Sequence, residues 1–186
     1  MMKNKASPEK VKSLIDRYEW IQCIVSALII CVIVFVFFVR IIDVKGWSMY
    51  PTLNNADKMV VSDLFYTPKQ GDIIVFQKDE YADYALVKRV IATEGQTIDI
   101  DFDSHEVYVD GVLMDEPYIA EPTANRIDFR GEMTVPEGCI FVMGDNRNDS
   151  TDSRDERIGM VDTRHVIGKV LFVAFPFDSF GSPYNN

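Results

Sequence analysis

The stretch GWSMYPTL, residues 46–53, is a polar turn that directly follows the long apolar run of the chain. Pro51 fixes its own φ and favours an extended Tyr50, while Gly46 permits a close backbone approach. Ser48, held between these constraints, is a candidate nucleophile. A serine in a loop usually has no catalytic role, so partners elsewhere in the chain must decide its function.

The apolar run upstream of this turn spans residues 20–39 and contains no charged residue. At about 1.5 Å per residue, a helix of this length crosses about 30 Å of hydrocarbon. A buried core helix this long would normally keep a polar face, and a cleavable signal peptide has a shorter apolar stretch. We expect an N-terminal segment over residues 1–19, a transmembrane helix in membrane lipid over 20–39, and a folded body over 40–186.

The distribution of charged residues predicts the orientation of the chain in the membrane and argues against one class of partner. Five basic residues precede the span, whereas only Arg40 and Lys45 follow it closely, so residues 1–19 should be cytoplasmic and the body extracytoplasmic at the cell membrane. Residues 46–186 carry twelve Lys/Arg and twenty-five Asp/Glu, a net charge of −13. Such a body repels phosphate backbones, so no nucleic acid partner is expected.

The body after the turn is predicted to be mostly antiparallel β. Short β-rich segments are bounded by Gly, Pro and Asp turn signals, and no stretch beyond Val39 has strong helical periodicity. We expect a hairpin or meander across residues 96–118, loop and edge strand over 124–135, and a frayed tail after Pro176. The other expected strands lie within residues 57–65, 71–77, 84–95, 138–149 and 165–175.

Lys88 is the candidate base. In strand alternation it shares a face with Leu86 and Val90, so it is either a solvated edge lysine or a partly buried one. As a general base for Ser48, its pKa would have to fall by roughly two to three units from about 10.4. His105 and His165 are typical of surface histidines; sequence order does not exclude a Ser-His-Asp triad, but nothing marks either residue as catalytic.

The remaining side chains offer no metal site. Cys23 and Cys31 lie in the apolar run, which leaves Cys139 alone in the body, without a disulfide framework or metal-ligand spacing.

Three segments together resemble the signatures of bacterial type I signal peptidases: GWSMYPTL, ALVKRVIATEG (residues 85–95) and VPEGCIFVMGDNRNDSTDSR (residues 135–154). GDIIVF, DGVLMDEPY and IGKV also look like segments of this family, in its order over roughly residues 9–176. These enzymes are Ser/Lys endopeptidases that release exported proteins from membrane-bound leaders. The single span is similar to the Gram-positive members.

The resemblance implies a role for each matching position. Ser48 would be the nucleophile and Lys88 the general base, with no metal and no organic cofactor. The Ser48 N–H would belong to the oxyanion hole, and Gly46 stands where some relatives place a second donor with a hydroxyl group. That second donor stays open. Ser150 would hydrogen-bond and orient the lysine.

The charged loop after residue 144 would brace the site. Without the resemblance, it reads as a solvated surface loop. The resemblance implies four supporting residues, of which the last two would form an ion pair: Asp145, Arg147, Asp152 and Arg154. One departure is ATEGQ at residues 92–96, where relatives often have Gly-x-Pro-Gly-Asp: Gly95 matches, but the Pro before it and the Asp after it are missing.

The expected substrates are signal peptides of secretory preproteins. The family cleaves after small residues in an Ala-x-Ala-like pattern. An extended leader could add to an exposed strand and place alternate side chains in shallow pockets. Met49, Leu53 and Val87 are candidate pocket walls because each lies beside a catalytic position.

Three alternatives stay open. The first is another Ser/Lys peptidase, such as a self-cleaving repressor, which would need a DNA-binding N-terminus in place of the apolar run. The second is a specialised peptidase for a narrow client such as pilin. The third is a non-catalytic membrane-anchored relative.

Overall fold

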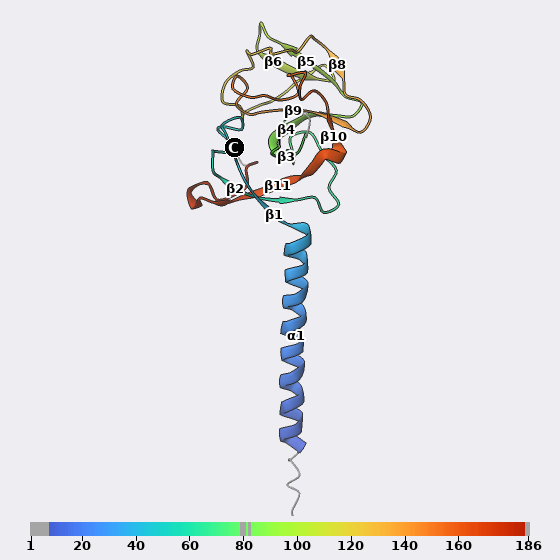
Figure 1. Ribbon diagram of the computed structural model, residues 1–186, viewed down its shortest axis with the longest axis vertical. Coiled ribbons are helices and arrows are strands. Elements are labelled where there is room, and N and C mark those ends of the chain that lie inside the picture. Colours follow the sequence, from blue (N-terminus) through green and yellow to red (C-terminus); the bar gives the residue numbers. More distant parts are fainter. Residues whose placement is uncertain (1–7, 79–80, 82, 185–186) are drawn as a thin grey trace, which may run out of the picture. The chain divides into compact units, whose positions relative to one another are not determined.

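The computed structural model describes residues 8–78, 81 and 83–184, and the chain divides into two units, Met1–Val39 and Arg40–Asn186. The first unit contains helix α1 (Pro8–Phe38) (Figure 1). Between residues 20 and 33, its large apolar side chains are exposed. The side chains of residues 34–38, which belong to the expected span 20–39, lie outside the described part.

Among the helical residues that the structure describes, no segment is both long and apolar enough to cross a membrane.

The second unit is built on a seven-stranded antiparallel sheet. Its spatial order is β1 (Arg40–Asp43), β2 (Lys58–Ser62), β11 (Val166–Phe175), β3 (Ile73–Phe76), β4 (Leu86–Thr93), β9 (Cys139–Met143) and β10 (Val161–Asp162). β4 lies between β3 and β9, with Lys88 opposite Ile74 and Arg89 opposite Met143. These two central pairings fix the position of the strand that carries Lys88.

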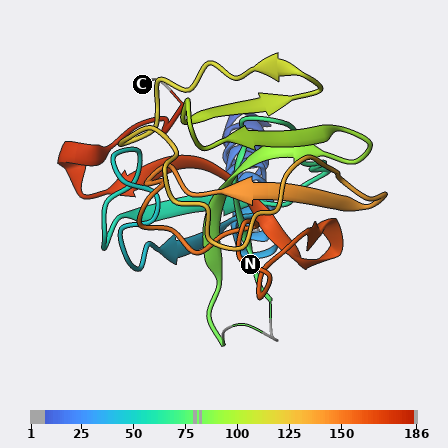
Figure 2. The same ribbon diagram turned by 90° about the horizontal axis from the view of Figure 1, so that it is seen from above.

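A four-stranded antiparallel sheet packs at the other end of the body from β1, β2 and β11 (Figures 1 and 2). Its order is β7 (Val112–Leu113), β6 (Glu106–Val109), β5 (Thr97–Asp101) and β8 (Met133–Thr134). The turn between β6 and β7 has positive φ at Asp110 (53°) and Gly111 (74°), the geometry that Asp-Gly favours in tight hairpins. The predicted meander and the edge strand within 124–135 are therefore confirmed.

Three apolar clusters hold the body together. One joins the two sheets and includes Ile91, Ile98 and Phe141. A second lies under the turn at residues 46–53 and includes Met49 and Leu53. The third covers part of the large sheet around Phe76, Val142 and Ile158. The mostly antiparallel β class is confirmed, since the described residues after Val39 add only two short 3₁₀ helices, η1 (Thr163–His165) and η2 (Phe177–Ser179).

The C-terminal tail is ordered through Tyr184, so the expectation of fraying after Pro176 is wrong there. Val173 and Gly181 form a β-bridge. The Tyr184 hydroxyl donates to the Val170 carbonyl (2.8 Å) and accepts from the Ile73 N–H (3.0 Å). An aromatic ring with two backbone partners therefore holds the tail against the core.

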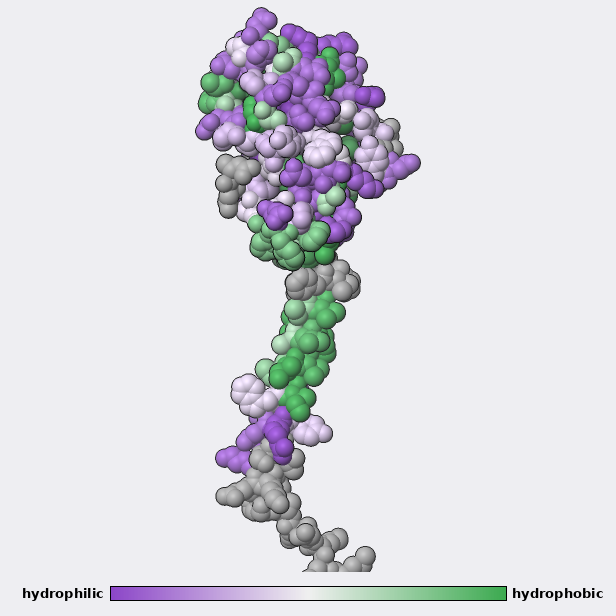
Figure 3. Space-filling model, turned by 90° about the vertical axis from the view of Figure 1, so that its left-hand side faces the viewer, coloured by the Kyte–Doolittle hydropathy of each residue, from purple (hydrophilic) through white to green (hydrophobic). Residues whose placement is uncertain are grey.

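Apolar side chains also gather on the surface at the end of the body formed by β1, β2 and β11 (Figure 3). Ile41, Phe177 and Phe180 are each more than half exposed. Phe172 pairs edge-on with Phe180, and Phe175 with Phe177. Exposed apolar residues in such a group mark a surface that contacts an apolar partner.

Candidate active site

The turn at residues 46–53 is tightly hydrogen-bonded. Gly46 adopts φ 92°, a conformation in which other residues are strained, and its N–H donates to Asn55 Oδ1 (2.9 Å). Tyr50 N–H donates to the Trp47 carbonyl (3.0 Å), and Leu53 N–H to that of Met49 (2.9 Å). The Tyr50–Pro51 bond is cis. The turn presents a half-buried Ser48 at its centre.

Lys88 reaches Ser48 from the central strand β4. Its Nζ donates to Ser48 Oγ at 2.6 Å, although the two residues are forty positions apart. The residue is 3% exposed. Burial lowers the pKa of Lys88 to about 8, and this effect outweighs the charges of Asp152 and Asp145, which raise it. A substantial fraction of the amine is therefore neutral near pH 8 and able to accept a proton from a hydroxyl group.

The loop that follows β9 clamps the serine turn from the other side. Asn146 N–H donates to the Ser48 carbonyl (3.0 Å), and Asn146 Nδ2 to the Trp47 carbonyl (3.2 Å). Sequence reasoning did not single out Asn146. The only signal for it was its position within the GDNR segment, between two residues expected to support the site.

Asp145 connects the serine turn with β4. Arg89 donates to both of its carboxylate oxygens, from Nε (2.8 Å) and Nη2 (2.6 Å), and Thr52 Oγ1 donates to Oδ2 (2.5 Å). All three residues are at most 9% exposed. Arg89 and Thr52 were also missed by sequence reasoning, although both lie in the segments that carry the resemblance.

Two further buried ion pairs stabilise the loop. Arg154 donates to both carboxylate oxygens of Asp152 (2.9 and 2.8 Å), as the resemblance implied. Although burial by itself raises the pKa of Asp152, the Arg154 guanidinium holds it below its ordinary value. Arg147 binds both oxygens of Glu116 (2.8 and 2.5 Å). The charged loop is therefore an internal scaffold, and the alternative of a solvated surface is wrong for these buried members.

Ser150 lies beside Ser48 and Lys88 with its hydroxyl unpaired. It is 9% exposed, and its Oγ has no hydrogen-bond partner among the described residues. The hydrogen bond to Lys88 that the resemblance implied is thus absent from this structure, in which Lys88 Nζ is bonded to Ser48 instead. Ser150, Ser48 and Lys88 line the same cavity, so the Ser150 hydroxyl is close to both of the other side chains.

The expected oxyanion donors differ in availability. In the described part of the chain, the Ser48 N–H has no acceptor and is free for a ligand. The Gly46 N–H, by contrast, is engaged with Asn55, and glycine has no side chain to replace it. The identity of the second oxyanion donor therefore stays open.

A cavity of about 210 Å³ opens at Ser48 and Lys88. It adjoins a second cavity of about 360 Å³, and the two share Lys45 and Tyr84. Other lining residues of the first are Gly46, Trp47, Tyr81, Leu86, Asp149, Ser150 and Thr151, and of the second Ile41, Ile42, Asp43 and Ala85. The two cavities lie along β1 and the residues that lead into β4.

The three residues expected to form substrate pockets do not line either cavity. Met49 (1% exposed) and Leu53 (0%) belong to the core under the turn, and the half-buried Val87 packs against the same cluster. Within the turn, the Leu53 N–H donates to the Met49 carbonyl, and the turn closed by this bond directs both side chains inward. Strand alternation likewise points Val87 away from the face that carries Lys88. Their assignment as pocket walls therefore stays a prediction.

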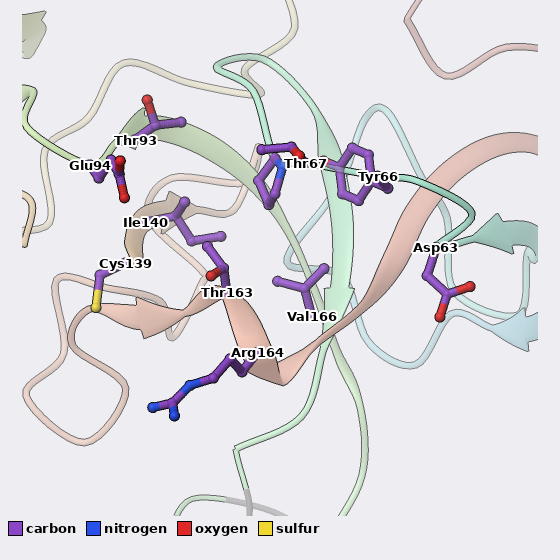
Figure 4. Close-up of a pocket in the computed structure, with 11 residues that line it drawn as sticks. Asp63, Tyr66, Thr67, Thr93, Glu94, Cys139, Ile140, Thr163, Arg164 and Val166 are labelled. Carbon is purple, nitrogen blue, oxygen red and sulfur yellow. The ribbon is translucent and has the colours of Figure 1, made fainter. Parts of the chain in front are cut away.

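The remaining candidates lie away from Ser48 and Lys88. His105 and His165 are exposed, the first in the β5–β6 turn and the second at the end of η1. No group of three or more His, Cys, Asp or Glu in the described residues could hold a metal ion. A cavity of about 420 Å³ lies at the far end of β4 from Lys88, lined by residues of β4, β9 and β11 such as Thr93, Ile140 and Val166 (Figure 4).

Comparisons with known proteins agree with the segments quoted above. Residues 17–175 match the family model described as signal peptidase, peptidase S26. The chain is 34% identical to Signal peptidase I of Bacillus licheniformis (95% of this chain, 97% of that protein) and 35% identical to Signal peptidase I S of Bacillus subtilis (91% and 93%). A crystal structure of a signal peptidase I from Enterococcus faecalis aligns with a TM-score of 0.45 at 31% identity, over 56% of this chain and 97% of that chain.

Proposed function

Because this chain belongs to the bacterial type I signal peptidases of peptidase family S26, which act on preproteins that carry signal peptides, we propose that it cleaves them with a Ser48–Lys88 dyad. The observation that carries this proposal is the 2.6 Å contact between Lys88 Nζ and Ser48 Oγ. A buried lysine with a lowered pKa is one of the known ways to activate a serine hydroxyl.

The reaction proceeds in two acyl-transfer steps. Neutral Lys88 takes the proton from Ser48 Oγ as this oxygen attacks the scissile carbonyl carbon. The Ser48 N–H stabilises the developing oxyanion. The lysine then gives its proton to the leaving amine, which departs as the N-terminus of the mature protein. Water, deprotonated by the same lysine, hydrolyses the acyl-enzyme and regenerates Ser48.

Substrate binding follows from the two adjoining cavities. An extended peptide takes the groove between β1 and residues 84–86, so that its backbone pairs with exposed strand groups and its scissile bond reaches Ser48. The cavity at Ser48 is small, which favours Ala-like residues on both sides of a larger one. Large residues at the two pocket positions of a test substrate should block cleavage.

Membrane attachment is part of the same proposal. The uncharged run 20–39 spans the cell membrane, with residues 1–19 in the cytoplasm and the body outside, as the basic residues before the span favour. The exposed apolar end of the body supports contact with lipid. Extraction of membranes at alkaline pH should leave the protein in the pellet, whereas Ile24→Lys with Ile29→Lys should release it. Release of the parent protein would contradict the anchor.

The catalytic proposal is tested with the detergent-solubilised chain and an exported precursor. We expect cleavage by the parent and loss of at least about a thousandfold for Ser48→Ala and Lys88→Ala. His105→Ala and His165→Ala, which lie away from the dyad, serve as controls and should cleave normally. Equal rates for the parent and Lys88→Ala would reject the lysine as the base, and no cleavage by the parent would favour a non-catalytic relative.

A further inference from the structure

Tyr118 lies on the segment between β7 and β8. This segment passes beside the loop that follows β9. Ala120 N–H donates to the Asp145 carbonyl (3.0 Å), so this segment is joined to the site by its backbone. The Tyr118 ring faces Arg89, whose Cζ is 3.8 Å from the ring centroid, and the Arg147 Cζ lies at 6.0 Å. One aromatic ring thus contacts two of the guanidinium groups that support the dyad.

The contact with Arg89 matters because of what Arg89 holds. Arg89 is next to Lys88 in β4 and binds both carboxylate oxygens of Asp145. The same carboxylate accepts the hydroxyl of Thr52, four residues after Ser48 in the serine turn. Arg89, Asp145 and Thr52 therefore form a continuous link between the strand that carries the base and the turn that carries the nucleophile.

The phenol group ties this link to the second ion pair. Tyr118 Oη donates to Glu116 Oε1 (3.1 Å), and Glu116 binds Arg147, whose Nε donates to the Gly144 carbonyl (3.1 Å). A flat ring over a guanidinium attracts its charge and keeps water from its face, which strengthens the hydrogen bonds made in the plane. An aliphatic side chain could fill the same space but would not supply this attraction.

From these contacts, and on the premise of the proposed function, we propose that Tyr118 is a positioning residue that holds the Arg89–Asp145–Thr52 link and thereby keeps the Ser48 turn against the Lys88 strand.

The link also sets how strongly Asp145 acts on Lys88. The groups that face Lys88 are Asp145, Asp152 and Arg154, and the cavity adds Lys45, Asp149, Tyr81 and Tyr84. Arg89 neutralises Asp145 as long as the two are paired. When the pairing loosens, more of the Asp145 charge reaches Lys88 and raises its pKa. If Tyr118 positions the Arg89–Asp145 pair, its loss should therefore raise the pKa of Lys88. If Tyr118 only fills space, its loss should leave that pKa unchanged.

The experiment compares full-length Tyr118→Leu and Tyr118→Phe in detergent. For the Leu variant we expect kcat to fall about tenfold with little change in KM, and the acid limb of kcat/KM to move up by roughly half a pH unit. The Phe variant keeps the ring and should stay within about twofold of the parent. Tyr108→Leu is the matched control, because Tyr108 also donates to a Glu two residues earlier (Glu106, 2.7 Å) but lies in the small sheet.

A readout without substrate separates this inference from the proposed function. The pKa of Lys88 is followed by NMR of ¹³Cε-labelled lysine, with its signal assigned from Lys88→Arg. It should rise in Tyr118→Leu and stay constant in Tyr108→Leu. If the parent cleaves no preprotein but the Lys88 pKa still rises in Tyr118→Leu, the proposed function is rejected and the inference stands.

Two outcomes would overturn the inference. The first is a Tyr118→Leu variant that is less thermostable but keeps the parent kcat, pH profile and Lys88 pKa, because Tyr118 would then only pack. If Tyr118→Leu does not fold, Arg89→Lys takes its place, since it keeps the charge and removes the planar group that stacks on the ring. The second outcome that would overturn the inference is an unchanged Lys88 pKa in Arg89→Lys.

Discussion

Gly144 and Ser150 are in such close contact that no side chain fits between them. A Cβ atom at Gly144 would lie 2.3 Å from Ser150 Oγ and 2.3 Å from the Ser48 carbonyl oxygen. The absence of a side chain at residue 144 therefore allows the loop after β9 to approach Ser48. The sequence marked this glycine only as the end of a strand.

Gly144→Ala should lower both stability and activity. Forcing a methyl group into this contact displaces the Ser48 backbone or the Ser150 side chain, at a cost of about 1–3 kcal/mol in the free energy of unfolding. Urea denaturation and preprotein cleavage measure the two effects. Gly95→Ala is the control, because Gly95 has φ 78° and no atom within 4 Å of the added Cβ. It should lose about 1–2 kcal/mol from backbone strain and keep its activity.

Ser150→Ala should separate activity from stability. The hydroxyl has no hydrogen-bond partner in the described structure, so its removal should leave the free energy of unfolding unchanged or raise it by about 1 kcal/mol. Cleavage should fall at least about tenfold if the hydroxyl orients Lys88 during the reaction. Ser153→Ala is the matched control, because Ser153 Oγ accepts the Val142 N–H (2.9 Å). Its loss should destabilise the fold; a larger destabilisation by Ser150→Ala would contradict the assignment.

The pH dependence of cleavage should follow the ionisation of Lys88. The amine must be neutral to accept the proton, and burial lowers its pKa to about 8. We expect kcat/KM to rise about tenfold per pH unit below that value and to level off above it. The rate profile of the parent enzyme with one precursor measures this. A profile that is flat between pH 6 and 8 would exclude Lys88 as the titrating base.

Lys88→Met should stabilise the protein at neutral pH while abolishing cleavage. Because burial lowers the pKa of Lys88 from its ordinary 10.5 to about 8 in the folded protein, the charged amine opposes folding below pH 8. Stability of the parent should rise between pH 8 and 10.5 as the folded state loses this proton first. At pH 7 the Met variant should gain about 2–3 kcal/mol. Thermal unfolding at pH 7 and 10 tests this, with exposed Lys58→Met as a control; no gain at pH 7 would contradict the burial cost.

Tyr184→Phe should destabilise the body without changing the pH profile of cleavage. The substitution removes the hydroxyl that bonds the Ile73 N–H and the Val170 carbonyl, and it leaves these groups without that partner. The expected loss is about 1–3 kcal/mol, measured by urea denaturation. Tyr108→Phe, which loses a surface bond to Glu106, should change stability by less than about 0.5 kcal/mol. Equal stability of the parent and Tyr184→Phe would show that the tail does not hold the core.

The sequence predicted the strands well because the signals for them are local. Apolar alternation and the Asp110-Gly111 turn act within a few residues, so the hairpin of β6 and β7 could be predicted without tertiary contacts. The expectation of a frayed tail after Pro176 was wrong because the contacts that order the tail are not local. Tyr184 is held by Ile73, which is 111 positions away. The residues after Pro176 contain no local signal for such a partner.

The site divides in the same way. Ser48 and Lys88 could be proposed as site residues from their segments. Only the fold brings Lys88 Nζ to 2.6 Å from Ser48 Oγ, forty positions away in the sequence, and only the fold buries the amine away from water. The burial of Met49 and Leu53 under the serine turn could not be predicted either. Neighbours of a reactive residue in sequence can point to its opposite side, and a turn decides which of them face the core.

The residue types alone determined which chemical groups are available: a hydroxyl and an amine on a β body that follows an apolar helix. Each of these features could be predicted from one short segment of sequence. Tertiary structure alone decided the pKa of Lys88, the ion pairs of Asp145 and the place of Tyr118. These depend on burial and on contacts between distant segments. Such contacts exist only after the two sheets have closed on a common core.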